Sequence, residues 1–287
     1  MPQFEFIQPN HINEVLDAIE HNDGYDIVLW GGGTATTQLL KQKLISPSRI
    51  VDVKRLPELA GISKTADGGV SIGACVRIRE IEQSELLKSM MPMVPETASW
   101  IGNVRVRNAA TLGGHLVHAD PAQDLPPLFL TLAAEIHLRS KRGSRIVPIQ
   151  EFFLDIMETA LEPDEMMTHI VIPNRSVGLR SAYVKYAPRS RDDYGTVGVG
   201  ASLKLAADGS TVESVGIAVG GAGPTARRFQ EAEQELLGQT LTDELCKRAG
   251  DIVAELVDPW DDGRGTADYK REMSRLWTAR LLRNIKV

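Results

Sequence analysis

The 287-residue sequence predicts an α+β fold made of two domains. Up to about residue 172, short apolar runs typical of strands alternate with stretches whose apolar residues recur at helical spacing. From residue 181 onward, two long β segments come first and three amphipathic helices follow them. Because sheet and helices are segregated there, we expect a separate α+β domain that begins near residues 174–180.

The chain opens with a strand, a helix, a second strand and a glycine turn. Alternating apolar residues at 4–9 predict the first strand, and the apolar stripe within 12–19 predicts the helix. The apolar run 26–30 ends at the glycine turn 31–34, after which leucines at helical spacing predict another helix. The same patterns then predict strands at 49–53, 62–64 and 70–72, and helices at 78–87 and 95–101.

The stretch 111–127 reads TLGGHLVHADPAQDLPP and comes before the remaining elements. A helix at 128–134 and strands at 135–139 and 166–172 follow, and Pro173 stops the last strand. In the second domain, an Asp-Gly pair within 206–210 is a strong hairpin signal between the two long β segments. Those segments are 197–205 and 212–219, and the helices are expected around 225–237, 242–256 and 266–284.

Composition excludes several classes of function. A net charge of −6 offers no general attraction to nucleic acid or to an anionic membrane surface. No N-terminal targeting segment is apparent, and no apolar run reaches the length of a membrane span. Two cysteines, Cys75 and Cys246, are too few for a disulfide framework or a cysteine-ligated cluster. We therefore expect a cytoplasmic protein with no nucleic-acid partner.

Two glycine segments each place paired glycines beside a hydroxyl residue, at 31–34 and 111–114. Glycine lets backbone N–H groups approach a ligand, and N–H groups at a helix start suit phosphate oxygens. Neither segment has the spacing of a P-loop or of the G-x-G-x-x-G fingerprint. A tight turn and a phosphate cradle therefore remain alternatives for both.

The second segment is followed by His115, His118, Asp120 and Asp124, which suggests a metal or acid–base site. The spacing His-x-x-His suits zinc only on one helical face, and the Glu of the H-E-x-x-H motif is absent. We expect no metal here. His118 remains either a neighbour of a bound ligand or a satisfied packing histidine.

Eight segments together resemble the FAD-binding medium subunit of the molybdenum hydroxylases, the family of xanthine and carbon monoxide dehydrogenase flavoproteins. They occur in the expected order and extend over nearly the whole chain. They read LWGGGT (29–34), TLGGHLVHADPAQDLP (111–126), LEPDEM (161–166), IVIP (170–173), YVKY (183–186), DY (193–194), GIAVGGAGPT (216–225) and DGRGTADY (262–269).

The resemblance implies a two-lobed FAD-binding domain of the PCMH type, like that of vanillyl-alcohol oxidase, at residues 1–176. Its subdomains would be about 1–55 and 56–176. A smaller C-terminal flavoprotein domain at 177–287 would carry an antiparallel sheet and helices.

The resemblance also implies a cofactor site. Both glycine segments would contact the FAD phosphates, Asp124 the ribityl or ribose region, and Tyr194 the isoalloxazine. The implied cofactor-binding residues are Gly31, Gly32, Gly33, Thr34, Ala35, Thr36, Thr111, Gly113, Gly114, His115, His118, Asp124, Leu161, Lys185 and Tyr194. None is a metal ligand, and no catalytic residue is assigned.

The chain departs from the family pattern at several of these positions. His115 and His118 stand where relatives commonly carry asparagine, and Thr34 and Ala35 replace the usual polar residues after the first glycines. Backbone contacts with the phosphates do not depend on these side chains. Without the resemblance, Tyr194 would read equally well as a loop aromatic and Lys185 as a solvated charge.

The resemblance implies that FAD is the redox cofactor of this chain, with molybdopterin and iron–sulfur clusters in partner subunits. Electrons would pass from a small two-iron subunit through FAD to an external acceptor, while a large molybdopterin subunit hydroxylates the substrate. The assembly would be a heterotrimer or a dimer of heterotrimers. Two alternatives are a stand-alone FAD-dependent oxidase or reductase, and a nonredox assembly module without FAD.

Overall fold

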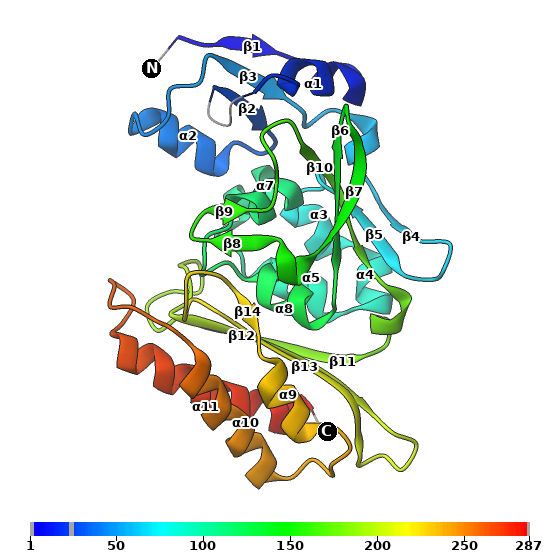
Figure 1. Cartoon of the computed structure of the whole chain (residues 1–287), viewed down its shortest axis with the longest axis vertical. Helices are drawn as coiled ribbons and strands as arrows, with labels where there is room; N and C mark the ends of the chain where they lie inside the picture. Colours follow the sequence, from blue (N-terminus) through cyan, green and yellow to red (C-terminus); the bar gives the residue numbers. More distant parts are fainter. Residues whose placement is uncertain (1–2, 23–25, 286–287) are drawn as a thin grey trace.

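The computed structural model describes residues 3–22 and 26–285. Its elements stack along the longest axis of the molecule (Figure 1). The N-terminal sheet lies at one end, a five-stranded sheet with its helices lies in the middle, and the C-terminal helices lie at the other end (Figure 1). Three clusters of buried apolar side chains correspond to these parts.

The N-terminal part is a three-stranded parallel sheet with two helices. Its strands are β1 (Glu5–Ile7), β2 (Ile27–Trp30) and β3 (Arg49–Asp52), in the order β1-β3-β2. Helix α1 (Ile12–Ile19) buries the apolar stripe that the sequence predicts, and α2 (Thr34–Lys41) follows the glycine turn directly. The turn therefore lies at the carboxyl end of a parallel strand, a place where ligands commonly bind.

The middle part is built on an antiparallel sheet in the order β4-β5-β10-β6-β7. These strands are β4 (Ile62–Lys64), β5 (Val70–Gly73), β6 (Glu135–Ser140), β7 (Gly143–Pro148) and β10 (Met166–Ile172). Its helices are α3 (Ile78–Gln83), α4 (Glu85–Met90), α5 (Met93–Ser99), α6 (Val104–Ala109), α7 (Leu112–His118) and α8 (Leu125–Thr131). A short hairpin, β8 (Phe153–Asp155) and β9 (Glu158–Thr159), and the 3-10 turns 57–59, 149–151 and 174–176 complete it.

Several boundaries differ from the sequence prediction for identifiable reasons. The helix expected at 78–87 is two helices, because Ser84 has an extended ψ of 114° and its Oγ caps α4 by accepting from the Leu87 N–H. Helix α8 begins three residues early, since prolines in the first turn need no N–H acceptor. Helix α9 begins late because Arg227 and Arg228 form an edge strand. The sequence missed α6, α7, β7 and the β8–β9 hairpin.

The C-terminal part is a four-stranded antiparallel sheet covered on both faces. Its strands are β11 (Arg180–Tyr186), β12 (Val197–Leu205), β13 (Val212–Gly220) and β14 (Arg227–Arg228). Helix α8 covers one face, and α9 (Gln230–Leu236) and α11 (Ala267–Ile285) cover the other, with α10 (Asp243–Leu256) packed on α11. Burial on both faces explains why 197–203 is a continuous buried run.

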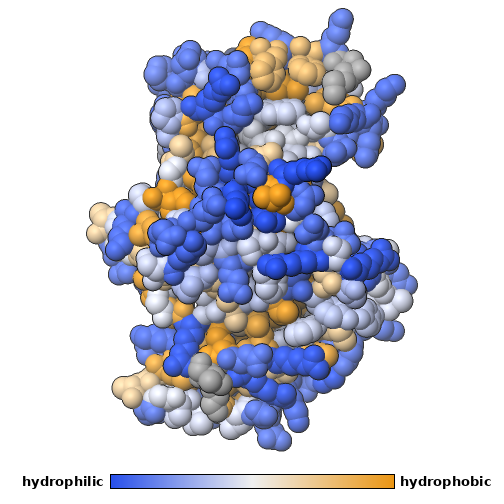
Figure 2. Space-filling view, turned by 180° about the vertical axis from the view of Figure 1, so that it is seen from behind, coloured by the Kyte–Doolittle hydropathy of each residue, from blue (hydrophilic) through white to orange (hydrophobic). Residues whose placement is uncertain are grey.

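The surface shows no single large apolar face in the view from behind. Hydrophilic side chains cover most of that face, and hydrophobic residues form scattered patches (Figure 2). In residues 3–22 and 26–285, no helix is long and apolar enough to cross a bilayer.

Candidate cofactor site

The two glycine segments, about eighty residues apart in sequence, touch each other in the structure. A Cβ added to Gly31 would lie 2.6 Å from Thr111 Oγ1, and one added to Gly32 would lie 2.0 Å from the Ala109 carbonyl oxygen. Only a residue without a side chain allows backbones to approach so closely. The segments that lead into α2 and α7 are therefore packed directly against each other.

The start of α2 offers unused backbone donors. Gly33 has a φ of 67° and supplies no side-chain cap to the helix. In the part of the chain that the structure describes, the N–H groups of Thr34, Ala35 and Thr36 donate to no protein acceptor. Unpaired N–H groups at the start of a helix attract anions. The start of α2 therefore suits phosphate oxygens.

At the start of α7, in contrast, the backbone N–H groups already have acceptors within the protein. The N–H groups of Leu112 and Gly113 donate to carbonyl oxygens in the segment 74–76, at 2.9 and 2.7 Å, and Gly113 is buried there. The N–H of Gly114 donates to Thr111 Oγ1 at 3.2 Å. Gly114 is exposed, and a Cβ on it would meet only that hydroxyl, at 3.0 Å. Gly113 thus packs inward, while Gly114 presents the open backbone.

Two buried polar atoms, His115 Nε2 on α7 and Gln123 Oε1 in the segment after it, have no partner among the described residues. Burial, and after it the positive charges of His118 and Lys185, lowers the pKa of His115 to about 3. The imidazole is therefore neutral and can hydrogen-bond a ligand. The Gln123 side chain is held in place because its Nε2 donates a hydrogen bond to the His115 carbonyl oxygen at 2.5 Å. The sequence reasoning missed Gln123, which no spacing rule marks.

His118 is half-buried at the last turn of α7. Burial lowers the pKa of His118, although the negative charge of Asp120 acts to raise it. Within residues 3–22 and 26–285, no group of three or more His, Cys, Asp or Glu side chains is placed to hold a metal ion. The arrangement on α7 is suited to hydrogen bonding.

Asp124 and Lys185 meet in a buried ion pair. Lys185 Nζ lies 3.1 Å from Asp124 Oδ2, and only 3% and 5% of the two side chains are exposed. Lys185 also donates to the Trp100 carbonyl oxygen at 2.9 Å, and the Tyr183 hydroxyl donates to Asp124 Oδ1 at 2.8 Å. Burial raises the pKa of Asp124 to about 6, although Lys185 and Tyr183 act in the opposite direction. This pair anchors β11 to α8.

Tyr183 is a site residue that the sequence reasoning missed. Successive side chains of a strand point to opposite faces, so Tyr183 and Lys185 share a face of β11. This alternation could have revealed Tyr183 as a partner of Asp124.

Tyr194 lies in the loop between β11 and β12, with 48% of its surface exposed. Burial of its hydroxyl end, and after it the negative charges of Asp120 and Asp124, raises the pKa of Tyr194 to about 12. The Arg264 guanidinium carbon lies 6.0 Å from the centre of its ring. The exposed ring therefore lies on the Asp124 side of the site.

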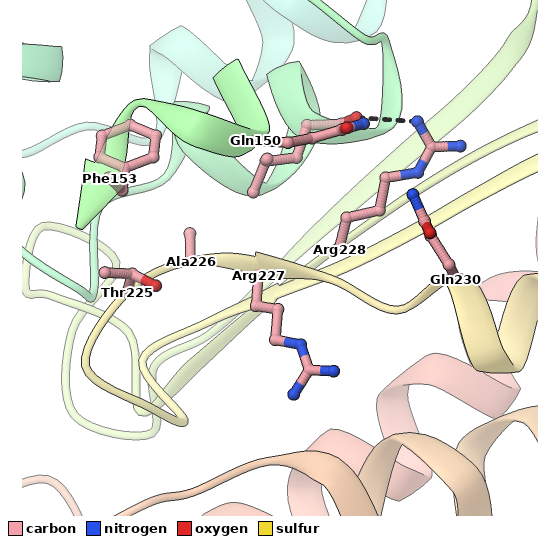
Figure 3. A pocket seen from close by; sticks show the side chains of 8 residues that line it. Gln150, Phe153, Thr225, Ala226, Arg227, Arg228 and Gln230 are labelled. Carbon is pink, nitrogen blue, oxygen red and sulfur yellow. Dashed lines mark hydrogen bonds between the residues drawn. The ribbon is translucent and has the colours of Figure 1, made fainter. Parts of the chain in front are cut away.

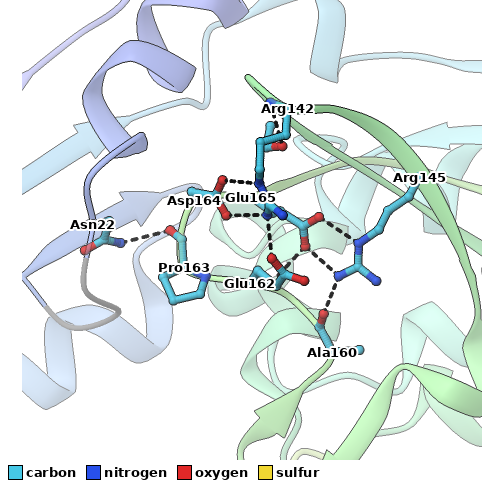
Figure 4. Close-up of polar contacts among 9 residues, drawn as sticks. Asn22, Arg142, Arg145, Ala160, Glu162, Pro163, Asp164 and Glu165 are labelled. Atoms are coloured by element: carbon cyan, nitrogen blue, oxygen red, sulfur yellow. Dashed lines mark hydrogen bonds and ion pairs between the residues drawn. The ribbon is translucent and has the colours of Figure 1, made fainter.

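Leu161 follows β9, which packs against α7, and it is half-buried against the middle core. Its segment is held by arginines of the β6–β7 hairpin (Figure 4). Arg145 binds both oxygens of Glu165 and the Ala160 carbonyl oxygen, and Arg142 binds Asp164. No hydrogen bond among the described residues joins Leu161 to the other implied site residues.

A separate cavity of about 240 Å³ lies between α8 and the segment 225–230 (Figure 3). Its two guanidinium groups already bind protein carboxylates: Arg227 binds Glu231 at 3.1 Å, and Arg228 binds Glu233 at 2.7 Å. Because its cations are paired and no residue implied in the cofactor site lines it, this cavity is distinct from that site.

The site combines donors for an anion, orphaned polar atoms and an exposed aromatic ring. These features fit a dinucleotide that carries both a pyrophosphate and a flat ring system. The fold and the site thus define a flavin-dinucleotide-binding protein.

Comparison with known families identifies the flavoprotein. The family described as "FAD binding domain in molybdopterin dehydrogenase" matches residues 2–175, and the "CO dehydrogenase flavoprotein C-terminal domain" matches residues 182–285. The chain belongs to the FAD-binding medium subunits of the molybdenum hydroxylases.

Individual relatives match over almost the full length. The glyceraldehyde dehydrogenase medium chain of Sulfolobus acidocaldarius is 33% identical over 284 residues, which cover 99% of both chains. The carbon monoxide dehydrogenase medium chain of Hydrogenophaga pseudoflava is 32% identical and covers 98% of this chain and 96% of its own. In a solved structure of carbon monoxide dehydrogenase from the same organism, the matching chain superposes with a TM-score of 0.93 at 33% identity, covering 98% of this chain and 96% of its own. The predicted family, fold class and FAD-binding domain are confirmed.

Proposed function

We propose that the chain holds FAD on the surface formed by the first turns of α2 and α7. The observation that carries this proposal is the contact between Gly31 and Thr111, which joins the unused N–H groups of residues 34–36 to the open face of Gly114. The pyrophosphate would accept hydrogen bonds from those N–H groups. His115 Nε2, buried without a protein partner, would bind a polar atom of the cofactor.

The remaining site residues would serve the flavin end of FAD. Asp124 would bind the ribityl or ribose region, and Tyr194 would cover a face of the isoalloxazine. Lys185, fixed by Asp124 and the Trp100 carbonyl, would place a positive charge that favours the reduced, anionic flavin. Leu161 would border the cofactor, and Gly113 would act by packing α7 against the segment 74–76.

The chain passes electrons through FAD within a larger complex. When bound, FAD would take up electrons from iron–sulfur centres of a small subunit and release them to an external acceptor. A large molybdopterin subunit would hydroxylate the substrate, in a heterotrimer or a dimer of heterotrimers. In support, relatives that match over the full length are named medium chains of dehydrogenases, which is against a stand-alone oxidase or reductase. A cytoplasmic location agrees with the use of only two cysteines.

We also propose a domain division at residue 176, with subdomains of about 1–55 and 56–176 in the first domain and with 177–287 as the second. The separate N-terminal, middle and C-terminal clusters of buried apolar side chains support it. The N-terminal cluster also includes Leu56, Leu59 and Met166, so the two subdomains share part of their packing.

Purification of the native protein tests the proposed function. We expect a yellow chain that copurifies with molybdenum and iron and whose flavin is reduced by the substrate of the complex. A yellow chain that oxidises a substrate by itself would contradict this proposal in favour of a stand-alone enzyme. A colourless chain would instead favour an assembly module.

Replacement of His115 is expected to separate cofactor binding from stability. His115→Leu removes an orphaned buried polar atom, so the flavin-free chain should become more stable by about 1–3 kcal/mol. The same change should weaken FAD binding by about tenfold, since one hydrogen bond to the cofactor is lost. Denaturant unfolding and flavin titration measure the two effects. His115→Asn, which keeps a polar group, should bind FAD almost normally; equal affinity in His115→Leu would exclude the hydrogen bond.

The Asp124–Lys185 pair predicts a pH dependence. The pKa of Asp124 is raised from 3.8 to about 6, so its contribution to stability is present at low pH and is lost as the pH rises through about 6. Above that pH the carboxylate is charged and paired with Lys185. We expect the flavin absorbance of the holoprotein to change with a midpoint near pH 6. Asp124→Asn should lack this transition, and a flat wild-type titration would contradict the assignment.

A further inference from the structure

The loop before α11 reaches across to the segment that carries Tyr194. Thr196 Oγ1 donates to the Arg264 carbonyl oxygen at 3.1 Å, and Arg189 Nη2 donates to the Gly263 carbonyl oxygen at 2.8 Å. These contacts fall on both sides of Tyr194 in the sequence. Residues 263 and 264 of the loop 258–265 are therefore attached to the Tyr194 segment.

A buried charge fixes the loop internally. Asp262 accepts from Arg264 Nη2 at 3.0 Å and from Lys270 Nζ at 2.9 Å, and only 1% of the Lys270 side chain is exposed. Lys270 also donates to the Trp260 carbonyl oxygen at 2.9 Å. Although burial opposes ionisation, hydrogen bonds from Lys270 and Arg264 lower the pKa of Asp262 to about 2. The Asp262 carboxylate thus pairs with two cations, Arg264 and Lys270.

Arg264 is the member of this cluster that faces Tyr194. Its guanidinium lies at the distance of a cation–π contact from the ring, and the fork that binds Asp262 fixes its orientation. On the other side of the segment, Arg191 lies 5.4 Å from the Trp100 ring and donates to Ser99 Oγ at 3.1 Å. The segment that carries Tyr194 is therefore attached to the C-terminal loop and, through Arg191, to the end of α5.

We propose that Arg264 is a positioning residue of the flavin site, which holds the Tyr194 ring in place and adds positive charge behind it. This inference rests on the proposed function, because it takes Tyr194 to cover the isoalloxazine. Loss of Arg264 frees the ring, so stacking on the flavin becomes incomplete. It also removes a positive charge that favours the reduced, anionic flavin.

The test compares Arg264→Gln with wild type in the purified complex. We expect unchanged FAD content, increased flavin fluorescence because a stacked tyrosine quenches it, and a more negative flavin reduction potential. Arg264→Lys keeps the charge but not the fork, so it should restore most of the potential and little of the quenching. If Arg264→Gln does not fold, Arg264→Lys alone still tests the positioning through its fluorescence.

Arg280→Gln is the matched control, because Arg280 is exposed and also lies over an aromatic ring, that of Trp277 at 5.1 Å. Arg280→Gln should change neither the flavin fluorescence nor the flavin reduction potential. In a Tyr194→Leu background, Arg264→Gln should add no further fluorescence. The inference would be overturned if Arg264→Gln had the flavin fluorescence and reduction potential of the wild type. It would also be overturned if the two changes had additive effects on fluorescence in the double variant. A wild-type complex without flavin would instead refute the proposed function.

Discussion

Gly114→Leu is expected to abolish FAD retention while the chain still folds. Gly114 is the exposed residue of the α7 turn, and a leucine side chain would project from the surface on which the pyrophosphate is proposed to lie. Inside the protein, the new Cβ would meet only Thr111 Oγ1 at 3.0 Å, a contact that a shift of a few tenths of an ångström relieves. We expect FAD affinity to fall by at least about a hundredfold, equivalent to about 2.8 kcal/mol. Flavin content after gel filtration and the circular dichroism spectrum measure the two outcomes.

Gly114→Ala is the graded control, since a methyl group blocks much less of the surface. It should retain FAD with reduced affinity and gain helix propensity in α7. Stoichiometric flavin in Gly114→Leu would refute the placement of the phosphates at this turn. Loss of the folded state in both variants would show that the residue acts through packing.

Lys185→Met is expected to destabilise the protein by about 3–5 kcal/mol, because it leaves the Asp124 carboxylate buried without its cation. Protonation of Asp124 relieves part of this loss, so the destabilisation should shrink at low pH. Denaturant unfolding at neutral and acidic pH measures the destabilisation and its decrease at low pH. The flavin potential, where FAD is retained, should become more negative.

Two further variants give this prediction its controls. Lys204→Met removes an exposed partner of Glu213 on the neighbouring strand and should change stability by at most about 1 kcal/mol. The double variant Asp124→Asn with Lys185→Met removes both charges and should recover a large part of the lost stability. If the effects of the two single changes on stability were additive, a direct interaction between Asp124 and Lys185 would be contradicted.

Local patterns predicted the elements whose burial follows from a single helix or hairpin. The stripe of α1 and the Asp208-Gly209 hairpin are confirmed because nearby residues determine them. The sequence predicts no helix at α7 and leaves residues 111–114 as a tight turn or a phosphate cradle, since paired glycines disfavour helix. The Thr111 cap and the burial of Leu112 and Leu116 overcome this preference, and that burial depends on the distant strand β5.

The candidate site could be predicted only in part from the sequence, because it too depends on contacts between segments that are distant in the chain. Two glycine segments of similar composition suggest equivalent roles, yet the N–H groups of residues 34–36 are unused. At the start of α7, those of Leu112 and Gly113 are bonded to the segment 74–76, and that of Gly114 is bonded to Thr111 Oγ1. Which donors remain is a tertiary property. Gln123 and Arg264 both fall within segments that carry the family resemblance, but no spacing rule gives either a role, and their roles became visible only through their contacts.

The flavin content of the purified wild-type chain within its native complex tests most directly whether this chain holds FAD at the starts of α2 and α7. We expect one FAD per chain, released by denaturation and lost in Gly114→Leu. A correctly folded chain, assembled with its partners and free of flavin, would contradict it.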